Sequence, residues 1–144
     1  MSIADLSSAP VYTAFADQPL AAAAREMRAR DVGALVVVDS RAQRPVGILT
    51  DRDIVRGQVE RRADLHCLTV GEVMTPNPVT VPAAAALSEA IQTMSAHGVR
   101  RAPVVDRSGA LQGIVTLDDL LPALAQQLSV LAGIADAQAR QRHA

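Results

Sequence analysis

The chain repeats itself, and this duplication constrains the fold more than any other feature of the sequence. Residues 20–39 and 87–106 align at an offset of 67, with eight identities in twenty positions. After a one-residue difference in the next loop, residues 47–54 align with residues 113–120, and four of those eight positions are identical. Chance gives only about two or three matches over the longer stretch, even in an alanine-rich chain. Each half therefore encodes the same structural unit.

Each repeat predicts the element order β-α-β-β-α. Apolar residues at i, i+3, i+4 and i+7, counted from Leu20 and from Leu87, predict an amphipathic helix of about three turns. The chain returns to a helical pattern after Thr50 and after Thr116. Short aliphatic runs bounded by turn residues predict strands at 11–14, 34–38, 46–49, 79–81, 103–105 and 113–115. The fold class is therefore α/β (α+β), built from two pseudo-symmetric repeats.

The size of the repeat suggests how the two halves combine. One unit of roughly 55 residues buries too little surface to be stable alone, so we expect two units packed face to face around a shared core. We place repeat 1 at 8–60, a linker with one helical turn at 61–73, repeat 2 at 74–126 and a helical tail at 127–144.

A broad leucine stripe runs from Leu117 to Leu131 and continues past the second repeat. Such a stripe is typical of a core helix, and we expect its last turns to pack on a second protomer. Pro122 lies inside this pattern and predicts a kink, or a helix start delayed by one turn.

Composition excludes several classes of protein. The 144 residues carry a net charge of −1, with all fourteen positive charges on arginine, so no basic field for a nucleic-acid backbone exists. Only 1% of the residues are aromatic, too few to stack the bases of a single strand. No 18 consecutive residues are apolar, no signal-peptide pattern opens the chain, and a single cysteine suits a reducing compartment. We expect a cytoplasmic protein with neither a nucleic-acid nor a membrane partner.

Both repeats place a Thr-x-x-Asp sequence where a strand meets a helix, at Thr50–Asp53 and at Thr116–Asp119. One interpretation is a capping box, in which each side chain satisfies backbone N–H groups at the helix start. The other is an anion site, because free N–H groups and the helix dipole attract phosphate, while the acid binds a ribose diol. The two roles are compatible, and Arg52 lies beside this anion position in repeat 1.

Four motifs resemble a tandem CBS (cystathionine-β-synthase) domain pair, or Bateman module, of the small stand-alone bacterial type that includes hypoxic response proteins. They are GILTDRDIV at 47–55, MTPNPVTV at 74–81, HGVRRAPVVD at 97–106 and GIVTLDDL at 113–120. The resemblance implies two clefts between the repeats that bind AMP, ADP or ATP, with S-adenosylmethionine or NAD as further possibilities. It also implies a homodimer and an effector protein that the sequence does not name, and no obligatory cofactor.

The same resemblance implies roles for individual residues. The threonines and the arginines would contact phosphate, the aspartates would bind the ribose hydroxyls, and main-chain groups near Thr80 and Pro103 would read the adenine edge. The implied site residues are Thr50, Arg52, Asp53, Thr80, Arg100, Arg101, Pro103, Thr116 and Asp119. Repeat 1 has Gly33, Ala34 and Val36 where repeat 2 has Arg100, Arg101 and Pro103, so we expect the two clefts to be unequal.

The sequence contains no P-loop, Rossmann fingerprint or Ser/His/Asp set, so we expect a non-catalytic regulatory module. One alternative is a dimerisation or protein-interaction module that needs no nucleotide. Another is a metal or redox sensor at Cys67, although His66 and Cys67 provide only two of the four ligands that zinc usually takes, and we assign no metal site.

Overall fold

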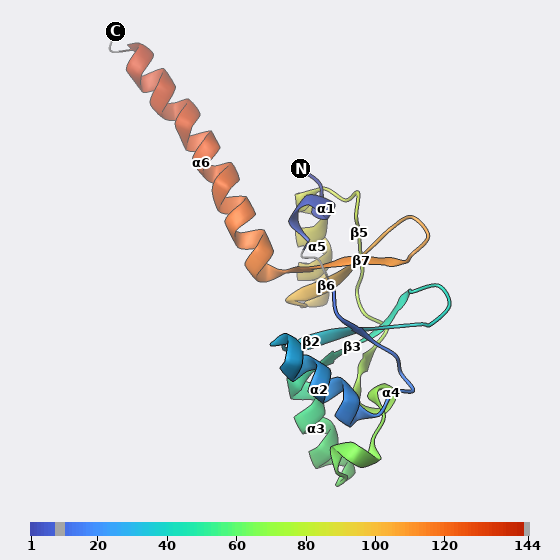
Figure 1. Cartoon of the computed structure of the whole chain (residues 1–144). Coiled ribbons are helices and arrows are strands. Elements are labelled where there is room, and N and C mark those ends of the chain that lie inside the picture. Colours follow the sequence, from blue (N-terminus) through green and yellow to red (C-terminus); the bar gives the residue numbers. More distant parts are fainter. Residues whose placement is uncertain (8–10, 143–144) are drawn as a thin grey trace.

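The computed structural model describes residues 1–7 and 11–142 and contains the β-α-β-β-α order twice (Figure 1). The first copy comprises β1 (Thr13–Ala14), α2 (Leu20–Arg30), β2 (Ala34–Val38), β3 (Pro45–Thr50) and α3 (Asp51–Arg61). The second comprises β5 (Val81–Pro82), α5 (Leu87–His97), β6 (Arg101–Val105), β7 (Leu111–Thr116) and α6 (Leu117–Arg142). The predicted fold class is confirmed. The first strand of each repeat is shorter than expected, with only two residues in β1 and two in β5.

Four short elements complete the described part of the chain. Before the first repeat lies α1 (Ile3–Leu6), and between the repeats lie the 3₁₀ helix η1 (Leu65–Cys67), α4 (Val70–Val73) and β4 (Thr75–Pro76). The helical turn expected between the repeats is therefore present as α4.

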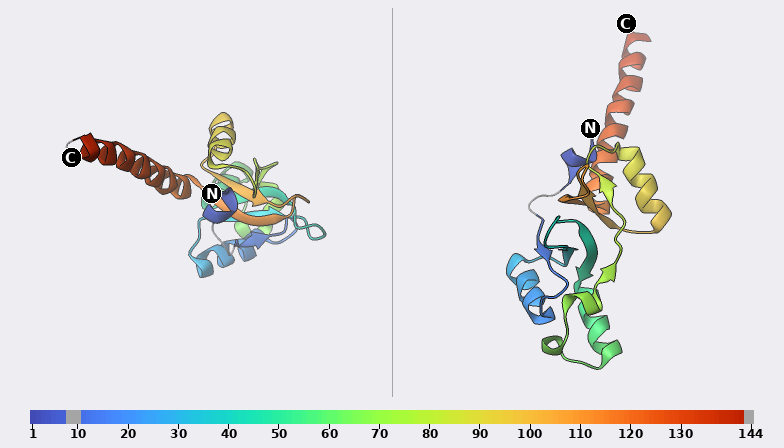
Figure 2. Two further views of the ribbon diagram at one scale, coloured as in Figure 1. Left: turned by 90° about the horizontal axis from the view of Figure 1, so that it is seen from above. Right: turned by 90° about the vertical axis from the view of Figure 1, so that its right-hand side faces the viewer.

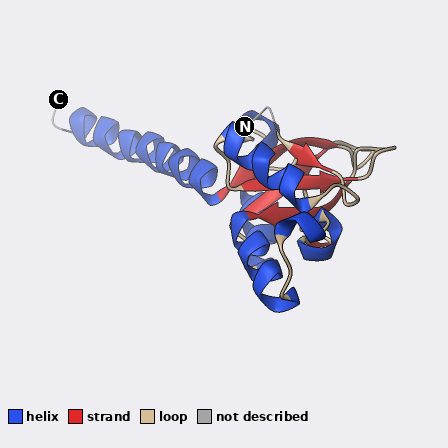
Figure 3. Cartoon of the chain, turned by 60° about the horizontal axis from the view of Figure 1, so that its bottom comes forward, coloured by secondary structure: helices blue, strands red, loops and turns tan. Residues whose placement is uncertain are grey.

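The strands form two sheets, ordered β1-β2-β3-β4 and β5-β6-β7 among the described residues. In both sheets the short first strand runs parallel to the next one, which then forms an antiparallel hairpin. Figure 1 and Figure 3 show the two sheets facing each other in the middle of the molecule, with the helices on the outside. The hairpin loop of repeat 1 reaches repeat 2, because the Leu111 N–H donates to the Gln43 carbonyl at 2.9 Å.

Each repeat has a hydrophobic core of its own between its sheet and its helices. Leu20, Leu35 and Val37 belong to one cluster, and Leu87, Val104 and Val115 belong to the other. This corrects the expectation of one shared core. Because side chains alternate along a strand, Val36 and Val38 point to the opposite face of the first sheet, toward the second sheet, and both are buried. The repeats therefore meet across a thin apolar layer between two separate cores.

The two short helices are exchanged between the repeats. α1 precedes repeat 1 but packs on repeat 2: Ile3 is fully buried in the second core, and its N–H donates to the Ala85 carbonyl at 3.0 Å. α4 follows repeat 1 and packs back on it, with Val70 buried in the first core and its N–H donating to the Gln18 carbonyl at 3.0 Å. All these positions differ by 67, so the internal symmetry extends beyond the motifs that revealed it.

The last helix leaves the body of the molecule (Figure 2). α6 begins at Leu117 and continues past Pro122, which corrects the expectation that this proline delays the helix start. Leu120 and Ala123 are buried, but Leu121, Leu124 and Leu128 are exposed, so the prediction that the leucine stripe forms core holds only for the first turns. By length and mean hydropathy alone α6 is long and apolar enough to cross a membrane, which the search for 18 consecutive apolar residues did not detect.

Candidate functional site

In repeat 1 the predicted Thr-x-x-Asp pair caps helix α3. The Thr50 hydroxyl accepts a hydrogen bond from the Asp53 N–H at 3.1 Å, and the Asp53 carboxylate accepts one from the Thr50 N–H at 3.0 Å. Both side chains are half-buried. The capping interpretation is confirmed here, and it holds both side chains in place at the positive end of the helix dipole.

Repeat 2 builds the same arrangement at the start of α6. The Thr116 N–H and hydroxyl both donate to Asp119 Oδ2, at 2.9 and 3.0 Å, and the Asp119 N–H donates back to the Thr116 hydroxyl at 3.3 Å. No described residue donates to Asp119 Oδ1. This oxygen therefore remains able to accept a hydrogen bond from a hydroxyl group.

The two aspartates differ in their outer oxygen. Asp53 Oδ1 accepts a hydrogen bond from the Thr75 hydroxyl on β4 at 3.5 Å, the long end of the range. Thr75 and Asp53 also line a hollow of about 260 Å³ with the charged residues Arg56, Glu60 and Arg61. Sequence reasoning missed Thr75, because only the pairing of β4 with β3 brings it to Asp53.

The two arginines predicted to meet phosphate lie at the N-terminus of α6. The Arg100 carbonyl accepts from the Leu117 N–H at 2.8 Å, and Arg101 is the cross-strand partner of Thr116. Arg100 is exposed and Arg101 is half-buried, and neither forms an ion pair with another described residue. Two unpaired positive charges therefore stand where the helix dipole already favours an anion.

Repeat 1 has the opposite charge at the corresponding place. Gly33 accepts from the Asp51 N–H at 3.1 Å in the geometry that Arg100 and Leu117 adopt, and Ala34 pairs with Thr50. The space beside Gly33 is bordered by the Asp51 carboxylate, whose Oδ2 lies 3.6 Å from where a Cβ would be. Arg52, the predicted phosphate contact of this repeat, is exposed, and its N–H donates to Asp51 Oδ1 at 2.8 Å.

Thr80, immediately before β5, is a neighbour of Pro103 on β6. The parallel register pairs Val81 with Val104, which places Thr80 one step earlier beside Pro103. Thr80 is half-buried and Pro103 is fully buried. The structure therefore gathers Thr80, Arg101, Pro103, Thr116 and Asp119 on one sheet and the adjoining helix start, while Thr50, Arg52 and Asp53 lie in the other repeat.

Cys67 is exposed and forms no disulfide, and His66 beside it approaches only the Asp64 carboxylate, at 4.0 Å. Within residues 1–7 and 11–142, no three His, Cys, Asp or Glu side chains lie close enough together to hold a metal ion.

Comparison with known protein families identifies the unit that occurs twice in this chain. The family model described as "CBS domain" matches residues 3–60 and again residues 70–126, which together cover most of the chain. The chain belongs to the CBS-domain family. Its two repeats form a CBS pair.

CBS relatives of similar size are found in bacteria. The chain is 40% identical to the uncharacterized protein YlbB of Bacillus subtilis over 114 residues, covering 78% of this chain and 74% of YlbB. It is 37% identical to hypoxic response protein 1 of Mycobacterium tuberculosis over 116 residues, covering 81% of this chain and 80% of that protein. The expected resemblance to hypoxic response proteins is thus confirmed.

Solved CBS pairs share the fold. Hypoxic Response Protein I with two coordinated zinc ions is 34% identical, with a TM-score of 0.72 over 83% of this chain and 96% of that one. The CBS domain pair of protein MJ0100, in complex with 5′-methylthioadenosine and S-adenosyl-L-methionine, is 26% identical, with a TM-score of 0.75 over 88% of this chain and 98% of that one. CBSX2 in complex with AMP is 25% identical, with a TM-score of 0.72 over 87% of this chain and 96% of that one.

Proposed function

We propose that this CBS pair is a regulatory module that binds an adenosine ligand carrying phosphate, such as AMP, ADP or ATP, with its second repeat as the stronger site. The observation that carries the proposal is the pair Arg100 and Arg101 beside the capped N-terminus formed by Thr116 and Asp119. Phosphate would lie against the helix N-terminus and the arginines, and the outer oxygen of Asp119 would accept a ribose hydroxyl.

Charge favours the second repeat over the first. The helix start in repeat 1 carries Asp51, Arg52 and Asp53, a formal charge of −1, and the Asp51 carboxylate borders the space that the arginines occupy in repeat 2. The corresponding group in repeat 2, formed by Arg100, Arg101, Asp118 and Asp119, sums to zero and offers two unpaired guanidinium groups. A second anion therefore enters repeat 1 less readily.

The adenine would be held without aromatic stacking. The chain has one tyrosine, one phenylalanine and no tryptophan, so aliphatic side chains and backbone groups near Thr80 and Pro103 must form the ring pocket. The CBS pairs that resemble this chain include complexes with AMP and with S-adenosyl-L-methionine, which supports an adenosine ligand as the class.

Ligand binding would change the arrangement of the repeats or protomers, and the protein would catalyse no reaction. A ligand shifts the equilibrium between two arrangements only by its differential affinity for them. We propose that the module works as a cytoplasmic homodimer without catalysis, and that an effector protein responds to this shift.

Titration calorimetry on protein freed of copurified ligand tests the site. We expect the double variant Arg100→Ala/Arg101→Ala to bind AMP about tenfold or more weakly, since hydrogen bonds to charged groups contribute about 1.5–3 kcal/mol each. Adenosine, which lacks the phosphate, should bind the variant and the wild type alike. Arg107→Ala removes an exposed arginine from the following hairpin loop and serves as the matched control.

Two results would contradict the proposal. If the double variant binds AMP as the wild type does, the arginines do not meet the phosphate. If neither AMP, ATP, S-adenosylmethionine nor NAD binds, the protein is an interaction module without a nucleotide.

A further inference from the structure

The outer part of α6 exposes an apolar surface that no described residue covers. The helix contains 26 residues, about 39 Å at 1.5 Å per residue, and every described residue after Ala123 is exposed. Nine large apolar side chains are strongly exposed among the described residues. Six of them lie on this helix: Leu121, Leu124, Leu128, Val130, Leu131 and Ile134.

Part of this surface has the spacing of a helix-pairing seam. Leu121, Leu124, Leu128, Leu131 and Ala135 follow one another at intervals of three and four residues. This 3.5-residue period keeps one stripe turned toward a partner helix, as in coiled coils. No charged residue interrupts positions 120–135. Helices gain most of their stability from packing an apolar face against other segments. We therefore expect this exposed stripe to pack against a partner.

The charges at the two ends of α6 indicate the direction of that partner. The first turn carries Asp118 and Asp119, and the last turn carries Arg140 and Arg142. Asp118 and Arg140 are 22 positions apart, about 33 Å along the axis, so they cannot pair within one helix. A second copy running antiparallel brings the acidic end of each helix to the basic end of the other, whereas a parallel copy places like charges together.

The same antiparallel register pairs the apolar positions. When Leu128 lies opposite Leu131 of the second copy, Leu124 lies opposite Ala135 and Leu121 lies opposite Gln138, because each pair of numbers has the same sum. Asp118 flanks the same stripe and Arg142 continues it, and their sum differs from that of the apolar pairs by one. Apolar contacts and charge pairs therefore agree on one alignment.

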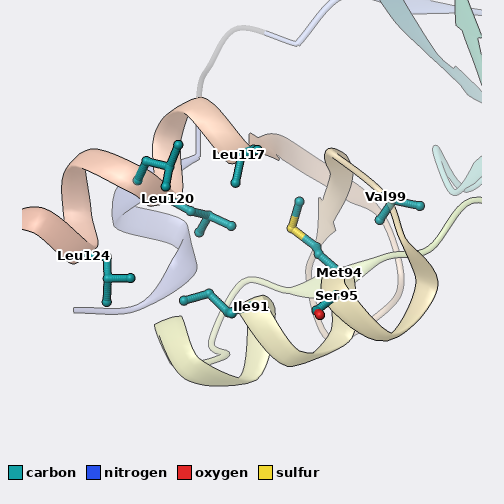
Figure 4. A pocket seen from close by; sticks show the side chains of 8 residues that line it. Ile91, Met94, Ser95, Val99, Leu117, Leu120 and Leu124 are labelled. Carbon is teal, nitrogen blue, oxygen red and sulfur yellow. The ribbon is translucent and has the colours of Figure 1, made fainter.

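The base of the stripe continues into an apolar hollow. A space of about 200 Å³ between α5 and α6 is lined by Ile91, Met94 and the leucines of the first turns of α6, including Leu121 and Leu124 (Figure 4). In the antiparallel register, the last turns of the second copy pass this hollow with small residues such as Ala135 and Ala139, which permit close approach.

We propose that two copies of this chain pair through an antiparallel contact of their α6 helices, with Leu128 and Leu131 at the centre and the charged ends facing each other. This contact is independent of adenosine binding, since the stripe from Leu121 to Ala135 contains no residue of the proposed ligand site. A membrane is disfavoured as the partner because residues 117–139 of the helix contain no lysine or arginine, whereas an interfacial helix carries such residues along its polar face.

Sedimentation equilibrium of the full chain tests the contact. Wild-type protein should be a dimer, and Leu128→Glu should raise the dimer dissociation constant at least about tenfold, because it places an unpaired charge in the seam. Val130→Glu is the matched control, since Val130 and Leu128 are both 62% exposed but Val130 lies on the other side of the helix. A monomeric wild type would overturn the proposal, and so would a Leu128→Glu variant that dimerises unchanged.

Disulfide cross-linking in a Cys67→Ser background tests the direction. Leu124→Cys combined with Ala135→Cys should give an oxidised covalent dimer, while neither single variant should do so, because each position faces the other and not itself. The two positions are about 16 Å apart along one helix, which excludes a bond within the chain. Cross-linking by either single variant would show a parallel pair and overturn the antiparallel contact.

A third experiment tests whether a membrane, rather than a second copy, covers the apolar stripe of α6. In it, the wild type is mixed with phosphatidylcholine vesicles. Protein that remains in the supernatant as a dimer supports the proposal, and monomer that pellets with the vesicles overturns it in favour of a membrane. Failure of AMP to bind would contradict the proposed function without affecting this contact.

Discussion

Asp39 and Asp106 organise the two hairpin loops from equivalent positions but with different partners. The backbone N–H groups of Ala42, Arg44 and Arg41 hold the pKa of the Asp39 carboxyl below its usual value of 3.8, with Ala42 contributing most. The pKa of Asp106 is also lowered, chiefly by the Ser108 hydroxyl, which donates to it at 2.6 Å. Backbone N–H groups hold the carboxylate in both loops, and the second loop adds a side-chain donor.

This difference predicts a selective effect of Ser108→Ala on acid titration. Both folded pKa values are below the unfolded value, so these carboxylates stabilise the fold above about pH 4, and the contribution is lost as pH falls through the folded pKa. We expect Ser108→Ala to raise the pKa of Asp106 and leave that of Asp39 unchanged, as measured by carboxyl-detected NMR titration. Equal shifts at both residues, or none at Asp106, would contradict the assignment.

At the scale of elements, the contact between α3 and α4 depends on a missing side chain. Gly57 lies buried on α3, and a Cβ there would overlap Val73 Cγ1 and come within 2.9 Å of Val73 Cβ. Glycine is unfavourable in a helix interior by about 1 kcal/mol relative to alanine, so its presence here reflects the close approach of α4.

We therefore expect Gly57→Ala to destabilise the protein by about 1–3 kcal/mol, the usual cost of overpacking, despite the better helix propensity of alanine. Gly133→Ala on α6 is the control: nothing lies within 4 Å of its Cβ, so the same change should be neutral or stabilising. Urea denaturation measures both. Adding Val73→Ala to Gly57→Ala removes the methyl groups that the new Cβ would overlap, so it should recover part of the lost free energy of unfolding. A Gly57→Ala single variant that is more stable than the wild type would contradict the packing argument.

At the scale of the whole molecule, the exchange of α1 and α4 ties each repeat to a segment outside its repeated motifs. Ile3 completes the core of repeat 2, and Val70 completes that of repeat 1. The first residues of the chain are therefore needed by its second half.

Two matched variants test this exchange. Ile3→Ala should lower the free energy of unfolding by about 2–4 kcal/mol, because it removes a fully buried side chain. Val70→Ala should lower it slightly less, because valine is smaller. Hydrogen exchange should accelerate first in repeat 2 for Ile3→Ala and first in repeat 1 for Val70→Ala. Local acceleration in the opposite repeats would show that the short helices are not exchanged.

The periodicity of the chain was sufficient to predict the order of helices and strands, because an amphipathic stripe or a β-branched run is a local property. It located β2 at the observed residues and both Thr-x-x-Asp caps, whose bonds join positions only three apart. It could not predict that α6 runs on past Pro122, because a helix already anchored by Leu120 and Ala123 tolerates the missing N–H.

The sequence by itself determined the duplication, the fold class and the difference between the Arg100–Arg101 pair and its counterparts Gly33 and Ala34. Only the tertiary structure decided that the cores are separate, that α1 belongs to repeat 2, that Thr75 reaches Asp53, and that the leucines of α6 lie in solvent. The physical reason is distance along the chain. These contacts join segments far apart in sequence. An apolar pattern predicts that a face is buried, but it does not identify the segment that covers that face.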